Sequence, residues 1–263
     1  MNNAEQVADL VAKLKSQGIP LQDVAWQTAL ACVGWPYVFG ASGQECTQSY
    51  RKTAYAAHGK DHPTIKTACQ YLKSGKSCSG CKWYPNGKRV RCYDCRGFTA
   101  WILKQAYDWS LAGAGATSQW NTAANWKSKG EIATMPKDKL CCLFVQKGKT
   151  MEHTGLGLNN ETIECSSGVQ HFTTRNKKWT HWAVPVCVEG GVTPTPTPTP
   201  EKGKAIVTGK NLALRQGPST DCSIVTRIAT GTTISIVDQP SGWTYVKYGN
   251  KTGFVMDKFI KKG

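Results

Sequence analysis

The chain has 263 residues, enough for one medium-sized domain and a second, small one. Hydrophobic residues make up 40% of it and it holds ten tryptophans, which indicates packed cores and excludes a disordered chain. The formal net charge of +16 predicts attraction to polyanions, a class that includes nucleic acid, anionic membranes and bacterial wall polymers.

The chain begins with a pattern typical of helices. Apolar residues recur at helical spacing in residues 4–16, and Pro20 opens a second helix that runs to about Gly34. Glu5 and Asp9 interrupt the apolar run that a secretion signal needs, and no segment reaches the roughly 18 apolar residues of a membrane span. We therefore expect a chain made in the cytoplasm, without a visible signal peptide and without membrane insertion.

A third helix is predicted over residues 96–107, with Cys95 at its start, and strands follow it. The strands are expected at residues 139–146, 153–158, 161–167 and 181–188. Helices first and strands afterwards, without alternation of the two, predict an α+β domain.

A low-complexity stretch separates this domain from the rest of the chain. Residues 193–200 read TPTPTPTP, and alternating proline holds the backbone near polyproline II without a packed element. We interpret residues 190–203 as a Thr-Pro linker between a first domain at 1–189 and a second at 204–263.

The second domain carries nine Lys and Arg against three Asp and Glu, a net charge of +6. Five or so short strands broken by turn residues predict a small all-β barrel. The segment resembles the bacterial Src-homology-3-like (SH3-like) domain in its LALRQGPS opening, its GWTYVKY strand and its closing TGFV. In that family the domain commonly tethers enzymes to the cell wall.

Three polar residues of the first domain could form a catalytic set. Cys95 opens a helix, where free N–H groups and the helix dipole lower a thiol pKa and favour the thiolate. His153 and Glu164 lie on two strands joined by the turn at residues 158–161, and if 158 pairs with 161, Glu164 lies diagonal to His153 on the same face. The carboxylate could then orient the imidazole. Each residue alone also fits a structural role.

The motifs GWPYVFGA (34–41), DCRGFTAWILKQA (94–106) and HTGLGLNNETIECSSGV (153–169) resemble the NlpC-like cysteine peptidases of bacterial cell-wall hydrolases. The resemblance covers residues 20–188 and implies a reduced papain-like α+β fold. It also implies cleavage of peptidoglycan stem peptides between γ-D-glutamate and the following diamino acid.

The resemblance implies a role for each matching residue. Cys95 is the nucleophile, His153 the base and Glu164 the third catalytic residue. Tyr37 is implied near the oxyanion and the substrate amine, and Asp94 near the same amine. No metal and no organic cofactor is needed for this chemistry.

Three features depart from the family pattern. Arg96 stands where the family has serine, which changes the substrate-side wall of the site. Glu164 replaces the usual histidine and would pair more strongly with an imidazolium. About 50 residues separate Gly40 from Asp94, where the family has a short connection.

This insertion contains cysteines that allow a competing interpretation. Two Cys-x-x-Cys pairs, 78/81 and 92/95, could form a closed zinc knuckle that would occupy the nucleophile. The ten-residue gap is shorter than in typical paired sites, so we expect Cys95 to be a free thiol. The other cysteines are expected to form, at most, a cluster that stabilises the insertion, made of Cys78, Cys81 and Cys92 with Cys69 or Cys46. The cluster could be a metal site or a set of disulfides. The alternative is that these cysteines are unpaired buried thiols.

The sequence therefore predicts a hydrolase of bacterial peptidoglycan that is a monomer. It is expected to be an endolysin, the kind of wall hydrolase that a phage releases. One alternative is an N-acetylmuramoyl-L-alanine amidase of the Cys-His-Glu type. Another is a zinc-dependent nucleic-acid-binding module, which leaves the hairpin histidine and the SH3-like domain unexplained. Peptidoglycan is the expected partner, with anionic wall polymers as further ligands and without nucleic acid.

Overall fold

The computed structural model describes residues 1–190, 203–215, 220, 224–239, 242–249 and 251–263. The chain divides into two compact units, one made of residues 1–13 and 24–191 and the other of residues 14–23 and 192–263. The predicted Thr-Pro stretch at 193–200 lies outside the described residues. Among the helices that are described, none combines the length and the apolar character of a membrane span.

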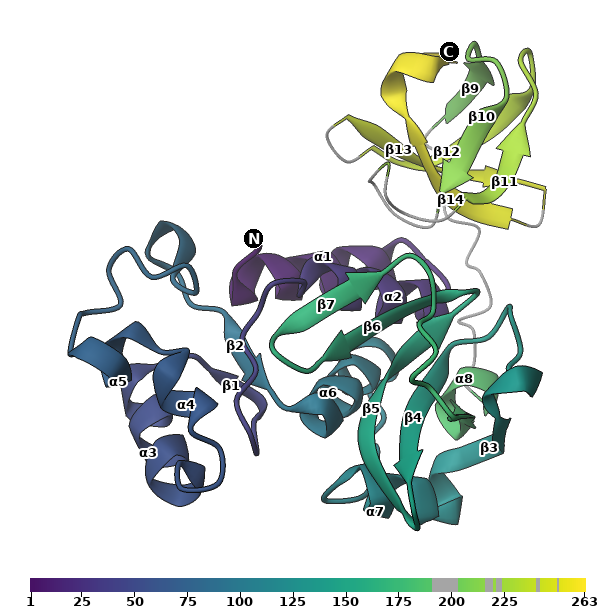
Figure 1. Ribbon diagram of the computed structural model, residues 1–263. Helices are drawn as coiled ribbons and strands as arrows, with labels where there is room; N and C mark the ends of the chain where they lie inside the picture. Colours follow the sequence, from purple (N-terminus) through teal and green to yellow (C-terminus); the bar gives the residue numbers. More distant parts are fainter. Residues whose placement is uncertain (191–202, 216–219, 221–223, 240–241, 250) are drawn as a thin grey trace. The chain divides into compact units, whose positions relative to one another are not determined.

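The eight α-helices of the described residues all lie before residue 191 (Figure 1), six of them entirely in the first unit and α1 and α2 partly. They are α1 (Ala4–Ser16), α2 (Leu21–Ala31), α3 (Gln48–His58), α4 (Thr64–Thr67), α5 (Gln70–Ser74), α6 (Cys95–Tyr107), α7 (Ala116–Asn121) and α8 (Val186–Gly190).

Two antiparallel sheets belong to the same unit. The small one pairs β1 (Ser42–Glu45) with β2 (Arg91–Tyr93). The large one has the order β3-β8-β4-β5-β6-β7. Its strands are β3 (Trp126–Glu131), β4 (Cys141–Lys147), β5 (Thr150–Leu158), β6 (Glu161–Cys165), β7 (Val169–Phe172) and β8 (His181–Pro185).

The central strands of the large sheet are buried and carry the core. Helix α6 packs against β5 and β6, and it buries Phe98, Ile102 and Leu103. Each large apolar side chain buried in this way contributes about 1.5–3 kcal/mol relative to an exposed one. The helix-then-sheet organisation confirms the α+β class predicted for this domain.

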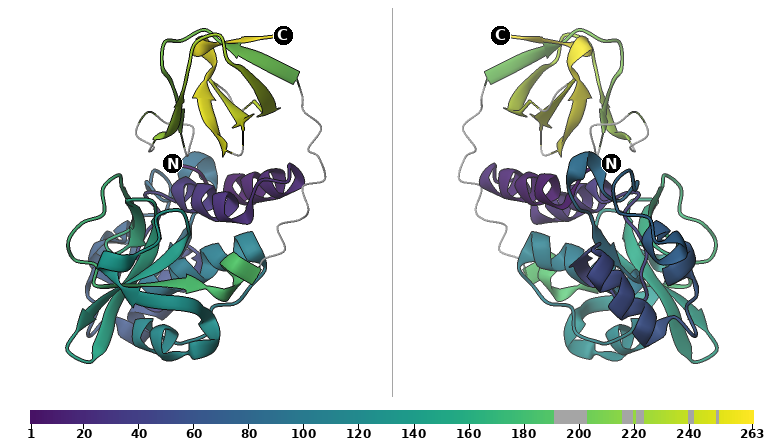
Figure 2. Two further views of the ribbon diagram at one scale, coloured as in Figure 1. Left: turned by 90° about the vertical axis from the view of Figure 1, so that its right-hand side faces the viewer. Right: turned by 90° about the vertical axis from the view of Figure 1, so that its left-hand side faces the viewer.

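The first two helices are antiparallel neighbours, and both views of Figure 2 show them as the purple pair. The amide of Asn2, just before α1, donates to the carbonyl of Ala31 at the end of α2, with a distance of 3.1 Å. Both helices agree with the predicted ranges to within a few residues.

One predicted strand is partly wrong. Residues 181–188 were expected to be extended, but β8 ends at Pro185 and residues 186–190 form helix α8. The last pairing of β8 with β3 is Pro185 opposite Trp126, so the sheet ends there and the chain is free to turn. Proline also supplies no N–H to continue a ladder.

The long insertion has structure of its own. Helices α3, α4 and α5 gather in one lobe beside the two-stranded β1–β2 sheet (Figure 1). Strand β2 runs directly into Asp94 and Cys95, so the insertion is anchored next to the start of α6.

In the second unit, the described residues from 203 onward form one seven-stranded antiparallel sheet of order β11-β10-β14-β13-β12-β9-β15. Its strands are β9 (Gly203–Val207), β10 (Leu212–Arg215), β11 (Ile224–Ile228), β12 (Thr233–Asp238), β13 (Trp243–Tyr248), β14 (Lys251–Met256) and β15 (Ile260–Lys262). A core of small aliphatic residues, Leu214, Ile228, Val246 and Val255 among them, is fully buried. The predicted all-β domain is confirmed, with two strands more than the five expected.

Candidate active site

Cys95 is the first residue of helix α6, as predicted. Asp94 caps the helix: its Oδ1 accepts the N–H of Gly97 at 2.5 Å, and its Oδ2 accepts the N–H of Gly40 at 3.1 Å. The carboxylate thereby satisfies a free N–H of the first turn and ties the helix to the loop before β1. Sequence reasoning placed Asp94 near the substrate amine, and the structure adds this positioning role.

The loop that carries Tyr37 lies against the start of α6. The N–H of Val38 donates to the carbonyl of Tyr93 at 2.8 Å, and the N–H of Asp94 donates to the carbonyl of Ala41 at 2.9 Å. A Cβ atom at Gly97 would come within 2.0 Å of the Ala41 carbonyl oxygen, so only glycine permits this approach.

His153 and Glu164 form a hydrogen-bonded pair. The predicted pairing of Leu158 with Glu161 is confirmed, and Gly155 then lies opposite Glu164. The His153 Nε2 and Glu164 Oε2 atoms are 2.8 Å apart. Glu164 is only 1% exposed, so the pair is shielded from solvent on the carboxylate side.

Two further residues hold this pair, and sequence reasoning missed both. The Nζ atom of Lys178 donates to Glu164 Oε1 at 2.5 Å. The indole of Trp179 stacks on the His153 ring, with centroids 5.4 Å apart and planes 22° from parallel. Burial alone would raise the pKa of Glu164, but the hydrogen bonds from His153 and Lys178 outweigh it and hold that pKa below its usual range.

Helix α6, which begins at Cys95, packs against β5 and β6. The last pair of the β5–β6 ladder is Gly155 with Glu164, and the backbone N–H of the preceding residue, Thr154, faces the Cys95 thiol. His153 is therefore next in the chain to Thr154, whose N–H faces Cys95. In the described part of the chain, the Cys95 thiol has no hydrogen bond to the His153 ring.

The pKa of the Cys95 thiol is raised, whereas its place at a helix start predicted a lowered pKa. Backbone N–H groups of Thr154, Arg96 and Cys95 lower the thiol pKa, as a helix N-terminus predicts. Burial and the charge of Asp94 outweigh them, so the pKa of Cys95 is raised above its ordinary value. A thiolate therefore requires a base to take the proton, rather than forming spontaneously at neutral pH.

Tyr37 and Arg96 flank this position. Burial, with the charges of Cys95 and Asp94, raises the pKa of the Tyr37 phenol, so its hydroxyl stays protonated and can donate. The guanidinium of Arg96 donates to the Ser42 hydroxyl at 3.0 Å and so points toward β1.

A second histidine–carboxylate pair lies on the other face of β6. His171 Nε2 contacts Glu161 Oε2, and the edge of Trp26 packs on the His171 ring. Residues 161 and 164 are three apart on a strand, so their side chains face opposite ways. A His–Glu contact alone therefore does not identify a catalytic histidine. His153 differs from His171 in its position next to Thr154, whose N–H faces Cys95.

The competing zinc knuckle is not assembled. Cys78 and Cys81 line a small cavity together with Cys46 and Cys69, and Cys95 does not line it. All eleven cysteines in the described ranges are free thiols.

The second unit has a cavity of its own, of about 210 Å³. Lys210, Arg215 and Arg227 line it beside the apolar residues Met256 and Phe259. This combination is suited to a ligand that carries negative charge as well as apolar groups.

Sequence comparisons with known proteins identify the family of the second unit. Residues 210–261 match the family described as the bacterial SH3 domain, which confirms the predicted SH3-like domain. A similar curated protein is YrvJ of Bacillus subtilis (strain 168), whose name gives N-acetylmuramoyl-L-alanine amidase as a provisional assignment. It is 30% identical over 56 residues, which span 21% of this chain and 11% of the length of that relative.

Solved structures similar to this chain include several NlpC/p60 domains. The domain of the peptidoglycan hydrolase SagA is 17% identical, with 35% of this chain and 76% of that one covered and a TM-score of 0.29. The P60 domain of an M. avium paratuberculosis antigen is 13% identical, with 69% and 94% covered and a TM-score of 0.34. RipD from Mycobacterium tuberculosis, described as a non-catalytic NlpC/p60 protein adapted to peptidoglycan binding, is 15% identical, with 68% and 97% covered and a TM-score of 0.32. Overlaps of this size carry no argument about the chemistry of this chain.

Proposed function

We propose that this protein is a peptidoglycan hydrolase in which a papain-like, NlpC-type cysteine endopeptidase is joined to a wall-binding SH3-like domain. The observation that carries the proposal is the Glu164–His153 pair, set one residue from the backbone N–H that contacts Cys95. A nucleophile at a helix start, a base and a buried orienting carboxylate are the parts that acyl transfer needs. The NlpC-like motifs around the same residues support the assignment.

The proposed reaction begins with transfer of the Cys95 proton to His153. The thiolate attacks the carbonyl carbon of the stem-peptide amide, and a tetrahedral oxyanion forms. The Tyr37 hydroxyl and backbone N–H groups near Cys95 stabilise that oxyanion. His153 returns its proton to the leaving amine, the C–N bond breaks and a thioester remains. Water, deprotonated by His153, then hydrolyses the thioester and regenerates the thiol.

Glu164 acts through His153 in this scheme. Its carboxylate accepts the imidazole N–H and stabilises the positive ring that forms when the thiol loses its proton. Trp179 restricts the ring by stacking on it. The raised pKa of Cys95 makes this base essential.

The bond we propose is the amide between γ-D-glutamate and the diamino acid, which the NlpC-like motifs favour. The glutamate at the third catalytic position favours a second candidate, the amide between muramic acid and L-alanine, because amidases of the Cys-His-Glu type have a carboxylate there. Mass spectrometry of digested walls separates the two. New diamino-acid amines support the first, and new N-terminal L-alanine supports the second and contradicts the first.

The second unit is proposed to hold the enzyme on the wall. Its family match, its charge of +6 and its basic, partly apolar cavity support binding to peptidoglycan or to anionic wall polymers. We also propose that the enzyme reaches the wall after release from the producing cell, as a phage endolysin does. Binding of residues 204–263 to purified walls, measured by sedimentation at rising salt, tests the first of these proposals.

A further inference from the structure

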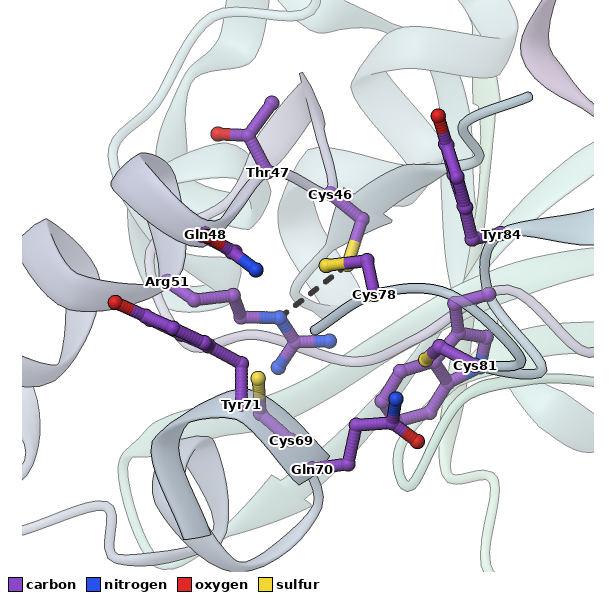
Figure 3. Close-up of a pocket in the computed structure, with 11 residues that line it drawn as sticks. Cys46, Thr47, Gln48, Arg51, Cys69, Gln70, Tyr71, Cys78, Cys81 and Tyr84 are labelled. Carbon is purple, nitrogen blue, oxygen red and sulfur yellow. Dashed lines mark hydrogen bonds between the residues drawn. The ribbon is translucent and has the colours of Figure 1, made fainter. Parts of the chain in front are cut away.

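Four cysteines from separate segments of the insertion line one cavity (Figure 3). Cys46 follows strand β1, Cys69 precedes helix α5, and Cys78 and Cys81 lie in the loop between α5 and β2. Residues up to 35 positions apart in the chain are thus brought to one place. Neither Cys92 nor Cys95 lines the cavity.

The cavity is very small, with a volume of about 10 Å³. That is room for about one water-sized sphere, too little for an organic ligand. Besides the four cysteines, its lining holds one cation, Arg51, together with aromatic and uncharged polar residues: Thr47, Gln48, Gln70, Tyr71, Trp83 and Tyr84. A single metal ion bound by the four sulfur atoms fits a cavity of this size and lining.

Arg51 gives an independent indication of negative charge at this place. Its side chain is 1% exposed, and neither Nη atom has a hydrogen-bond partner. Its Nε atom donates to the Cys46 sulfur at 3.4 Å, and its guanidinium lies over the Trp83 ring, 4.9 Å from the centroid. A buried cation with unused donors is costly unless anionic groups face it. Four thiolates around one divalent metal ion leave a net negative charge, which would compensate Arg51.

The loop at Cys78 and Cys81 already has the form of a ligand-bearing turn. The N–H of Cys81 donates to the carbonyl of Cys78 at 3.0 Å, and Gly80 has a φ of +72°, which closes the turn. Two cysteines separated by two residues are the commonest half of a structural zinc site.

The surrounding segment lacks a core that could hold it in place. Between residues 66 and 89, only Cys69 and Trp83 are buried. Helix α5 has no buried residue at all among its five described positions. A segment of this kind usually needs a metal ion or a disulfide to stay folded.

We propose that Cys46, Cys69, Cys78 and Cys81 bind one structural zinc ion that holds the insertion against the two-stranded β1–β2 sheet. Four thiolates saturate tetrahedral zinc, so the site is closed and takes no part in the acyl-transfer chemistry. Within the described residues no three potential ligands converge closely enough to hold a metal as they stand. Binding therefore requires the four thiols to turn inward to Zn–S distances of about 2.3 Å.

The test is the zinc content of the full-length chain, purified under reducing conditions with zinc present and then desalted. We expect one zinc per chain in the wild type and in Cys187→Ser, a control that removes a buried thiol outside the cavity. We expect loss of that zinc in the Cys78→Ser/Cys81→Ser double variant. In the wild type, alkylation and mass spectrometry should show the four thiols protected until a chelator is added.

Wild-type protein without bound zinc would overturn the proposal, whether or not the double variant folds. Disulfides among these four cysteines, found by intact mass under reducing purification, would also overturn it. Unchanged zinc in the double variant would show that the metal lies elsewhere. Because the readout is metal content, these outcomes are independent of wall hydrolysis.

Discussion

Replacement of Glu164 by glutamine tests the arrangement around His153 most specifically. The side chain keeps its shape but loses the charge that faces both His153 and Lys178. A hydrogen bond to a charged group contributes about 1.5–3 kcal/mol, and about 1.4 kcal/mol corresponds to a factor of ten in rate. We therefore expect Glu164→Gln to lower kcat/KM on soluble stem peptides by roughly 10- to 100-fold.

The same substitution should change the pH dependence of stability. Because the folded pKa of Glu164 is depressed, its carboxylate stabilises the fold above the unfolded pKa of about 4.3, and this contribution is lost as pH falls through the folded value. The wild type should therefore be more stable than Glu164→Gln near neutral pH, and the difference should shrink below about pH 4. Urea unfolding at several pH values measures this difference.

The matched control is Glu152→Gln on the neighbouring strand β5. The Glu152 side chain is 49% exposed and lies 3.6 Å from Lys147, so its loss should change neither kcat/KM nor stability appreciably. If Glu164→Gln had the kcat/KM of the wild type, the proposed orienting role of Glu164 would be refuted. Equal losses in the two variants would refute it as well.

Three further predictions concern other parts of the molecule. Alkylation of Cys95 by iodoacetamide should be slow at neutral pH and should rise with a midpoint above about 8.5, because its pKa is raised; a midpoint well below 7 would contradict this. Gly97→Ala should lower the free energy of unfolding by about 1–3 kcal/mol, because the new Cβ meets the Ala41 carbonyl, and an unchanged melting temperature would count against the close approach. Deletion of residues 201–263 should leave turnover of soluble stem peptides nearly unchanged and weaken activity on intact walls; equal loss on both substrates would mean that the second domain shapes the active site.

The parts of the fold that depend on local signals could be predicted from the sequence. Helix α6 begins at Cys95 as expected, because Asp94 is a strong N-cap residue followed by apolar residues at helical spacing. The β5–β6 hairpin has the expected register because Asn159 adopts a positive φ of 55° in a two-residue turn. That register was sufficient to place His153 and Glu164 on one face.

Features that depend on contacts distant in the sequence could not be predicted. Lys178 and Trp179 reach Glu164 and His153 only because the segment before β8 returns to the centre of the sheet. Helices α4 and α5 of the insertion have four and five residues, too few for an apolar periodicity that would predict them. The raised pKa of Cys95 has the same kind of cause, because burial by the folded chain outweighs the local effect of the helix start.

The central claim is that Cys95 is the nucleophile of a wall hydrolase. Its most direct test is the digestion of purified peptidoglycan by the wild type, Cys95→Ala and the control Cys187→Ala, with released fragments followed by mass spectrometry. We expect the wild type and the control to release the same fragments. Cys95→Ala should release none, although it should keep the circular dichroism spectrum of the wild type. His153→Ala should behave like Cys95→Ala. Digestion by Cys95→Ala at the wild-type rate would contradict the account.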